Sequence, residues 1–189
     1  MQAAESVLNF WFSPAAKSHW FQADMDFDAE IARRFGDLLH AARNDRLSHW
    51  EDTARGALAL VIVLDQFARN IYRGNAKAFM LDPLARNVAS RAIERRFDEA
   101  LSPQQKMFLY MPFMHSEALS DQDRCVALCR NAGLSNLEYA EHHRDIIKRF
   151  GRFPHRNALL ARPNTAEETR YLASGDAFTG GQKSPALHD

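Results

Sequence analysis

The chain has 189 residues, 46% of them hydrophobic, and its 24 Lys and Arg residues balance 24 Asp and Glu residues. This length and composition suit one domain with a substantial core. A net charge of zero provides no field that would draw the protein to nucleic acid or an anionic membrane, so neither is an expected partner. The sequence has no apolar stretch of roughly 18 residues and no pattern of a secretion signal, so we expect a cytoplasmic protein.

The N-terminal part of the chain has the spacing of amphipathic helices. A short helix is expected over residues 4–12, where a proline follows the aromatic cluster. Apolar residues over 27–42 recur at the 3.6-residue period and predict a second helix. Asp26 or Asp28 is expected to cap its beginning.

The stretch 53–72 is predicted to be one helix and the most buried in the fold, because it is apolar through several turns before any charge appears. Its polar residues then cover an arc of about 140° on one side. Buried charges must be paired or used. The arc therefore predicts either an ion pair between Asp65 and Arg69 that fixes helix packing or the floor of a ligand pocket. The residues of this arc are Asp65, Gln66, Arg69, Asn70 and Arg73.

Capping patterns mark the beginnings of the later helices. Asp82 is expected to cap one helix, and capping boxes at Ser102, Ser135 and Thr165 predict three more. Pro112 lacks an N–H group and should kink or end its helix just before the next residue.

The helix expected after Ser135 has an apolar face with His143 at its middle, whereas His142 points elsewhere. His143 is therefore expected to face inward and His142 outward. Gly151 ends this helix, so the arginines that follow it can turn back over its end.

No stretch alternates with the period of a strand. We therefore expect an all-α single domain of about eight packed antiparallel helices over residues 1–178, followed by a disordered tail at 179–189. Cys125 and Cys129 lie on one predicted helix and are expected to be reduced.

Four sequence segments carry a resemblance to a known family: LDQFARNIYRG from residue 64, residues 79–82, FLYMPFMHSE from residue 108, and HHRDIIKRFGRFPHRN from residue 142. Together with the opening FWF they resemble the uncharacterised bacterial family known as domain of unknown function nine-hundred-twenty-four. The resemblance implies a tetratricopeptide-like superhelical arrangement and implies no activity. Ala68 stands where the family pattern commonly has proline. The signature positions that the resemblance implies are Asp65, Gln66, Arg69, Asn70, Arg73, His115, Glu117, His143, Arg149, Gly151, Arg152, His155, Arg156 and Asn157.

Polar residues stand at the ends of otherwise apolar helices in separated segments, which is how pockets in helical domains are built. The arginines of these segments outnumber the two carboxylates, Asp65 and Glu117, so a carboxylate or phosphate ligand would balance the charge. We therefore expect a pocket that binds a small anionic molecule. The predicted ligand-binding residues are Gln66, Arg69, Asn70, Arg73, Arg152, His155, Arg156 and Asn157. The residues expected to converge on the pocket are Asp65, Arg69, His143, Arg152 and Arg156.

Acid–base catalysis is the simplest chemistry for such a site, with His143 or His115 acting beside Asp65 or Glu117. The sequence has no close metal-ligand spacing such as HExxH, and the neighbouring arginines disfavour a divalent cation, so we expect neither metal nor cofactor. The alternative is a non-catalytic tetratricopeptide-like module that binds a peptide or protein and whose buried polar residues are structural. An exposed groove would favour this module, and an enclosed pocket would favour a small molecule.

Overall fold

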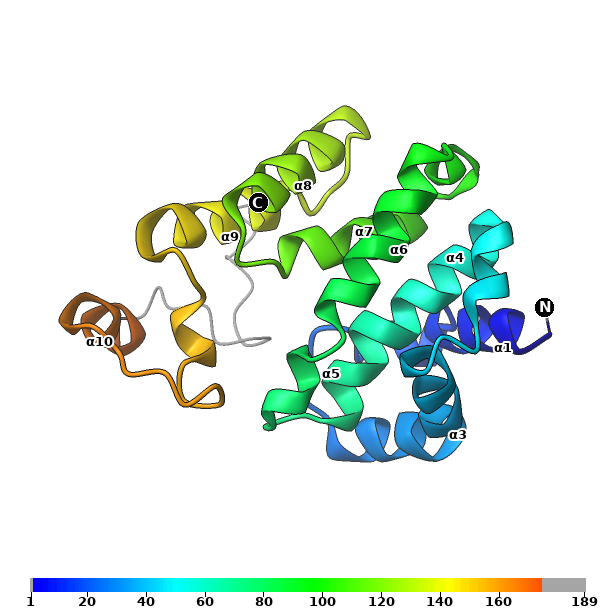
Figure 1. Ribbon diagram of the computed structural model, residues 1–189, viewed down its shortest axis with the longest axis horizontal. Helices are drawn as coiled ribbons and strands as arrows, with labels where there is room; N and C mark the ends of the chain where they lie inside the picture. Colours follow the sequence, from blue (N-terminus) through cyan, green and yellow to red (C-terminus); the bar gives the residue numbers. More distant parts are fainter. Residues whose placement is uncertain (1, 175–189) are drawn as a thin grey trace.

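The structure is a computed structural model that describes residues 2–174. These residues form helices joined by turns and contain no strand, which confirms the expected all-α single domain. Figure 1 shows α1 (Gln2–Trp11) and α3 (Met25–Arg43) toward one end of the long axis and α10 (Ala166–Ala173) at the other. The tail expected at 179–189 lies outside the described residues.

The α-helices alternate with short 3₁₀ segments along the chain. Helices α7, α8 and α9 pack against one another in sequence order. No helix within residues 2–174 is long and apolar enough to cross a membrane. The other elements are α2 (Pro14–Lys17), η1 (Ser48–Asp52), α4 (Ala54–Val61), η2 (Ile62–Phe67), α5 (Ala68–Ile71), η3 (Ala76–Phe79), α6 (Asp82–Glu94), η4 (Phe97–Ala100), α7 (Pro103–Met114), α8 (Leu119–Asn131), α9 (Leu137–Phe150) and η5 (Pro154–Arg156).

The elements α4, η2 and α5 form one continuous rod through the core. Residues 56–68 are all buried, the longest such run in the described chain, so the prediction of a central buried helix is confirmed. Its middle, η2, is a π-helix, which was not predicted. A π-helix has i→i+5 hydrogen bonds, is rare, and is frequent at functional sites. Asp65 and Gln66 both lie on it.

Asp24 caps α3 in place of Asp26 or Asp28, so that prediction is wrong. The Asp24 side chain accepts hydrogen bonds from the backbone N–H groups of Asp26 and Phe27. An N-cap residue must be extended and lie directly before the first turn, and Asp24 meets this condition. Asp28 is thereby available for a contact with α5.

Pro112 lies inside α7, and the helix continues past it to Met114. Pro112 was expected to kink or end the helix just before Phe113, and the helix does not end there. Pro112 removes one backbone hydrogen bond near the end of the helix, and residues 108–114 around it are all buried. Burial of this apolar segment compensates for the lost bond.

Two of the three predicted capping boxes, at Ser102 and Thr165, are confirmed. The third, at Ser135, does not form. Helix α9 has Asn136 as its N-cap, and the Asn136 side chain makes no capping hydrogen bond. Both Ser135 and Asn136 instead line a cavity.

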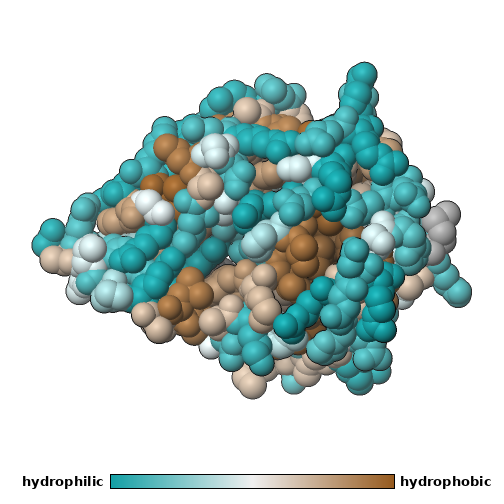
Figure 2. Space-filling model, viewed as in Figure 1, coloured by the Kyte–Doolittle hydropathy of each residue, from teal (hydrophilic) through white to brown (hydrophobic). Residues whose placement is uncertain are grey.

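One hydrophobic core joins α1 through α9, and a smaller cluster that includes Ile146, Phe153 and Tyr171 lies near the C-terminal end. Cys125 and Cys129 are free and buried, as expected. Figure 2 shows a mostly hydrophilic face on which hydrophobic side chains, in brown, are visible in the hollows between helices.

Candidate functional site

A cavity of about 700 Å³ opens among α5, α7, α9 and η5. This volume lies within the range of small-molecule sites. A smaller hollow of about 490 Å³ beside α1 contains none of the predicted residues. The predicted residues that line the larger cavity are Gln66, Arg69, Asn70, Arg73, His115, His143, His155 and Arg156.

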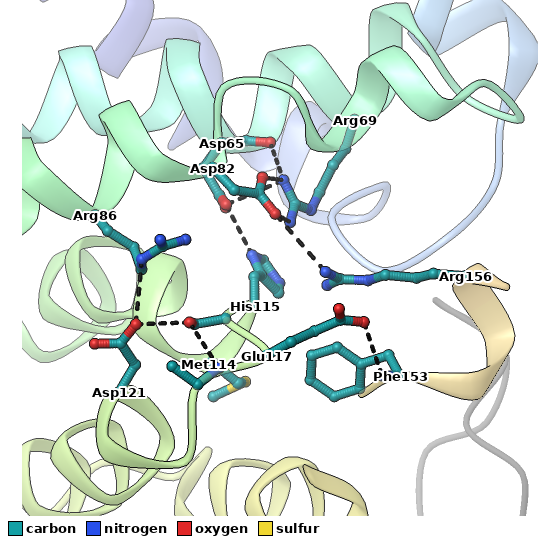
Figure 3. A network of polar contacts seen from close by, with 12 residues as sticks. Asp65, Arg69, Asp82, Arg86, Met114, His115, Glu117, Asp121, Phe153 and Arg156 are labelled. Atoms are coloured by element: carbon teal, nitrogen blue, oxygen red, sulfur yellow. Dashed lines mark hydrogen bonds and ion pairs between the residues drawn. The ribbon is translucent and has the colours of Figure 1, made fainter. Parts of the chain in front are cut away.

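Asp65 lies fully buried behind the cavity wall. Its Oδ1 atom is 2.8 Å from Nδ1 of His115 and 3.1 Å from Nη1 of Arg69 (Figure 3). The Gln66 amide donates a hydrogen bond to the other carboxylate oxygen. Burial raises the pKa of Asp65, but the charge of Arg69 and the contact with His115 outweigh burial and hold this pKa well below its usual value. Asp65 is therefore a carboxylate at neutral pH.

An ionised carboxylate only accepts hydrogen bonds, so the proton between His115 and Asp65 belongs to Nδ1 of the imidazole. The Nε2 atom of His115 then carries the lone pair. Burial, together with the charge of Arg69, lowers the pKa of His115 below its ordinary value, so the ring is neutral. Its Nε2 atom can accept a proton from a bound molecule.

Arg69 has a second carboxylate partner that the sequence analysis missed. Its Nη1 and Nη2 atoms donate to the two oxygens of Asp82 at 2.8 and 3.1 Å. Asp82 is the first residue of α6 and not its cap, so the predicted capping role is wrong. Arg69 is thus balanced within the protein by Asp65 and Asp82.

Arg73 and Asn70 share Asp28 on α3. The Asn70 amide donates to Asp28 at 2.7 Å, and Nη2 of Arg73 donates to the same carboxylate at 2.9 Å. Because Arg73 is exposed, this pair lies at the mouth of the cavity. The predicted surplus of arginine over carboxylate is therefore smaller than expected, since Asp28 and Asp82 were not counted.

Arg156 is the arginine of this cavity that keeps unused hydrogen-bonding capacity. It is only 6% exposed, and its Nη1 atom is 3.8 Å from Asp82, beyond hydrogen-bonding distance. Its Nε atom has no hydrogen-bond partner in the described part of the chain. The guanidinium lies over the rings of Phe79 and Phe153, at 4.6 and 4.5 Å. Burial, together with the charge of Arg69, lowers the pKa of Arg156 to about 10.

Two further histidines line the cavity in their neutral form. Nδ1 of His143 lies 2.7 Å from the carbonyl oxygen of Tyr139, which can only accept, so Nδ1 carries the proton. Burial lowers the pKa of His143 to about 3, and burial with the charge of Arg156 lowers that of His155 to about 3. His143 faces inward and His142 is exposed, as predicted. Across residues 2–174, no group of three or more His, Cys, Asp or Glu side chains is placed to hold a metal ion.

Arg152, Glu117 and Asn157 do not line the cavity, and their expected place in it is wrong. Arg152 pairs with Glu168 through contacts of 2.6 and 2.8 Å. Glu117 pairs with Arg162 at 2.7 Å, and Nε of Arg162 donates to Asn157 at 2.9 Å. These contacts fasten the segment after α9 to itself and to the end of α7. The partners of Arg152 and Glu117 lie 16 and 45 positions away in the chain, so local sequence patterns do not connect them.

Apolar and amide residues that the sequence analysis did not assign to the site form the rest of the wall. Met107, Met111 and Met114 lie at helical spacing on one face of α7, a pattern that could have identified them. Asn136 is 8% exposed, and neither its amide nitrogen nor its amide oxygen has a partner within residues 2–174. The other unpredicted lining residues are Trp20, Phe21, Gln22, Ala23, Gly74, Ala78, Phe79, Ser135, Tyr139 and Leu159.

The protein is thus an all-α domain with a buried Asp–His–Arg network beside a cavity. Residues 7–176 match the bacterial proteins of unknown function called DUF924, and the chain belongs to that family. It is also similar to the solved structure of ATU0120, a protein of unknown function from Agrobacterium tumefaciens. The TM-score is 0.88 and the identity 43%, over 92% of this chain and 98% of that one. No curated protein matches the chain. The resemblance found from the sequence is therefore confirmed.

Proposed function

We propose that the cavity binds a small molecule through an anionic group held by Arg156. The observation that carries this proposal is the buried Arg156 guanidinium, whose Nε atom has no hydrogen-bond partner among residues 2–174. A buried charged donor left unsatisfied is costly, whereas a carboxylate or phosphate forms strong, often bidentate hydrogen bonds with arginine. The lowered pKa of Arg156, about 10, shows that burial disfavours its charge. A bound anion would reverse this effect.

His115 supports acid–base chemistry on the bound molecule. Figure 3 shows the Arg156 guanidinium pointing toward the His115 ring. Asp65 holds that ring by its Nδ1 atom, which leaves Nε2 as a proton acceptor. Arg69 and Gln66 in turn hold Asp65 in place. The assignment of His115 as general base and Asp65 as its positioning residue follows from this chain of contacts, and His143 is a second neutral imidazole at the same cavity.

A small molecule is favoured over a peptide because the inner part of the cavity wall is buried. Arg156, His143 and Met111 are each less than 9% exposed. Their burial is typical of a site that encloses most of its ligand. A peptide-binding groove would present such contacts along an exposed surface.

Isothermal titration calorimetry with a panel of small carboxylates and phosphate esters tests the proposal. We expect an anion that binds the wild type and binds the Arg156→Gln variant at least about tenfold more weakly. The matched control is Arg130→Gln, which removes an arginine whose partner, Glu141, lies on the surface. Failure of every anion to bind, or equal binding by Arg156→Gln, would overturn the proposal. Thermal unfolding of each variant shows whether it is folded.

A further inference from the structure

The two ends of the cavity differ in chemistry. The polar end contains His115, His143 and Arg156, with Asp65 behind it. The apolar end is formed by Met107 together with Trp20 and Phe21. The Trp20 ring packs on Phe108, with ring centres 4.6 Å apart, which places Trp20 beside the N-terminal half of α7.

Helix α7 connects these ends. Met107, Met111 and Met114 line the cavity in turn, and His115 follows directly at the C-cap. Eight residues of α-helix at 1.5 Å each separate Met107 from His115, a length of about 12 Å. The wall between the two ends is therefore a methionine stripe, and methionine side chains adapt to flexible apolar groups.

Helix α9, which packs on α7, contributes residues in the same order. Asn136 and Tyr139 precede His143 along the cavity wall. His143 belongs to the polar end. Its ring centre lies 5.6 Å from that of Phe153, and the Arg156 guanidinium lies over the same Phe153 ring. Followed from N- to C-terminus, both helices therefore run toward the polar end of the cavity.

The polar end is deep and the apolar end is near the solvent. Arg156 is 6% exposed, whereas Phe21 is 56% exposed. An isolated carboxylate would leave the methionine stripe uncovered, and a purely apolar molecule would leave Nε of Arg156 without a hydrogen-bond partner. Only Arg156 among the cavity arginines lacks a carboxylate within hydrogen-bonding distance in the described chain, so a head group with a single carboxylate is enough to accept from its free donors.

We infer that the ligand is an amphipathic monocarboxylate of medium chain length that enters head first. The inference rests on the proposed function and specifies its substrate class. The carboxylate binds Arg156, and the apolar chain lies along Met114, Met111 and Met107 toward Phe21. Each methylene buried on this wall should strengthen binding about fourfold.

Titration calorimetry of the full chain with butanoate, hexanoate and octanoate, below micellar concentrations, tests the inference. From butanoate to octanoate we expect affinity to rise on the order of a hundredfold. 1-Octanol and octylamine have the same chain without the carboxylate and should bind at least about tenfold more weakly than octanoate. Octanol binding as tightly as octanoate would overturn the head-group assignment.

Substitutions at the apolar end and at the polar end of the cavity test the two contacts separately. Met107→Gln should weaken octanoate binding about tenfold and leave butanoate binding unchanged, because only the longer chain reaches residue 107. Met25→Gln is the control, since Met25 is 85% exposed and does not line the cavity. Arg156→Gln should weaken both ligands, and Arg156→Lys, which keeps the charge but not the planar donor pair, should weaken them less.

The results distinguish this inference from the proposed function. Arg156-dependent binding of carboxylates with no gain from chain length would overturn the inference and leave the proposed function intact. Absence of binding by every carboxylate and by inorganic phosphate would overturn both. If affinity rises with the length of the ligand but Met107→Gln does not reduce that rise, the apolar part of the ligand lies elsewhere. This result would also overturn the inference.

Discussion

Nδ1 of His115 lies 2.8 Å from Oδ1 of Asp65, although the two residues are 50 positions apart in the chain. The contact joins the π-helix η2 to the C-cap of α7. It fixes the His115 ring by Nδ1 and leaves the lone pair of Nε2 free at the cavity wall. The tautomer of His115 is therefore the most direct test of the site.

Long-range ¹H–¹⁵N NMR of labelled protein should show His115 neutral at pH 7, with the proton on Nδ1. The reason is that ionised Asp65 can only accept a hydrogen bond. The His115→Gln variant assigns the signal, because the corresponding resonances disappear. A protonated Nε2 in the wild type would show that His115 cannot serve as the base in its resting state.

Arg69→Met should lower the free energy of unfolding by about 3–5 kcal/mol, because it leaves the fully buried Asp65 carboxylate without its arginine and removes the hydrogen-bonded arginine of Asp82. Arg73→Met is the control, four residues later and just beyond the end of α5. Arg73 is exposed to solvent, so its pair with Asp28 should contribute less than about 1 kcal/mol. Urea unfolding at pH 7 measures both values, and equal losses would contradict the assigned difference in burial.

His143 should make stability depend on pH in the acidic range. Its folded-state pKa is about 3, below the unfolded value of about 6.5, so the unfolded state binds the proton more readily as pH falls. The stabilisation is complete above about pH 6.5 and is lost toward pH 3, with about 2 kcal/mol lost by pH 5. His143→Gln should therefore lose about 2 kcal/mol less unfolding free energy than the wild type between pH 7 and pH 5, as measured by urea unfolding. His142→Gln, at the exposed neighbouring residue, should show the wild-type dependence.

Asn136→Leu should raise the free energy of unfolding by about 1 kcal/mol. Both polar atoms of the buried Asn136 amide lack partners within residues 2–174, and a similar-sized apolar side chain removes that cost. Asn131→Leu at the exposed end of α8 should change stability by less than about 0.5 kcal/mol. Calorimetric unfolding measures both. A large loss for Asn136→Leu would indicate that its amide is hydrogen-bonded in solution.

Local rules were enough to predict much of the architecture. The apolar period predicted the buried rod and placed His143 inward and His142 outward, because the direction of a helical side chain depends only on its position along the helix. The capping boxes at Ser102 and Thr165 also involve residues only three positions apart. The sequence therefore determined the helices, their buried faces and the polar segments that approach the cavity.

Only the tertiary structure decided which charges pair and which remain open to the cavity. Asp28, Asp82 and Glu168 bind arginines that the sequence analysis had assigned to a ligand. Ion pairing depends on where distant segments meet after packing, and no local period encodes that distance. The π-helix at Asp65 is similarly invisible to hydrophobic spacing, because the residues before it are apolar on every side of the helix. The direction in which a helical side chain points depends on its position in the sequence, whereas the partner of a buried charge depends on how the fold packs.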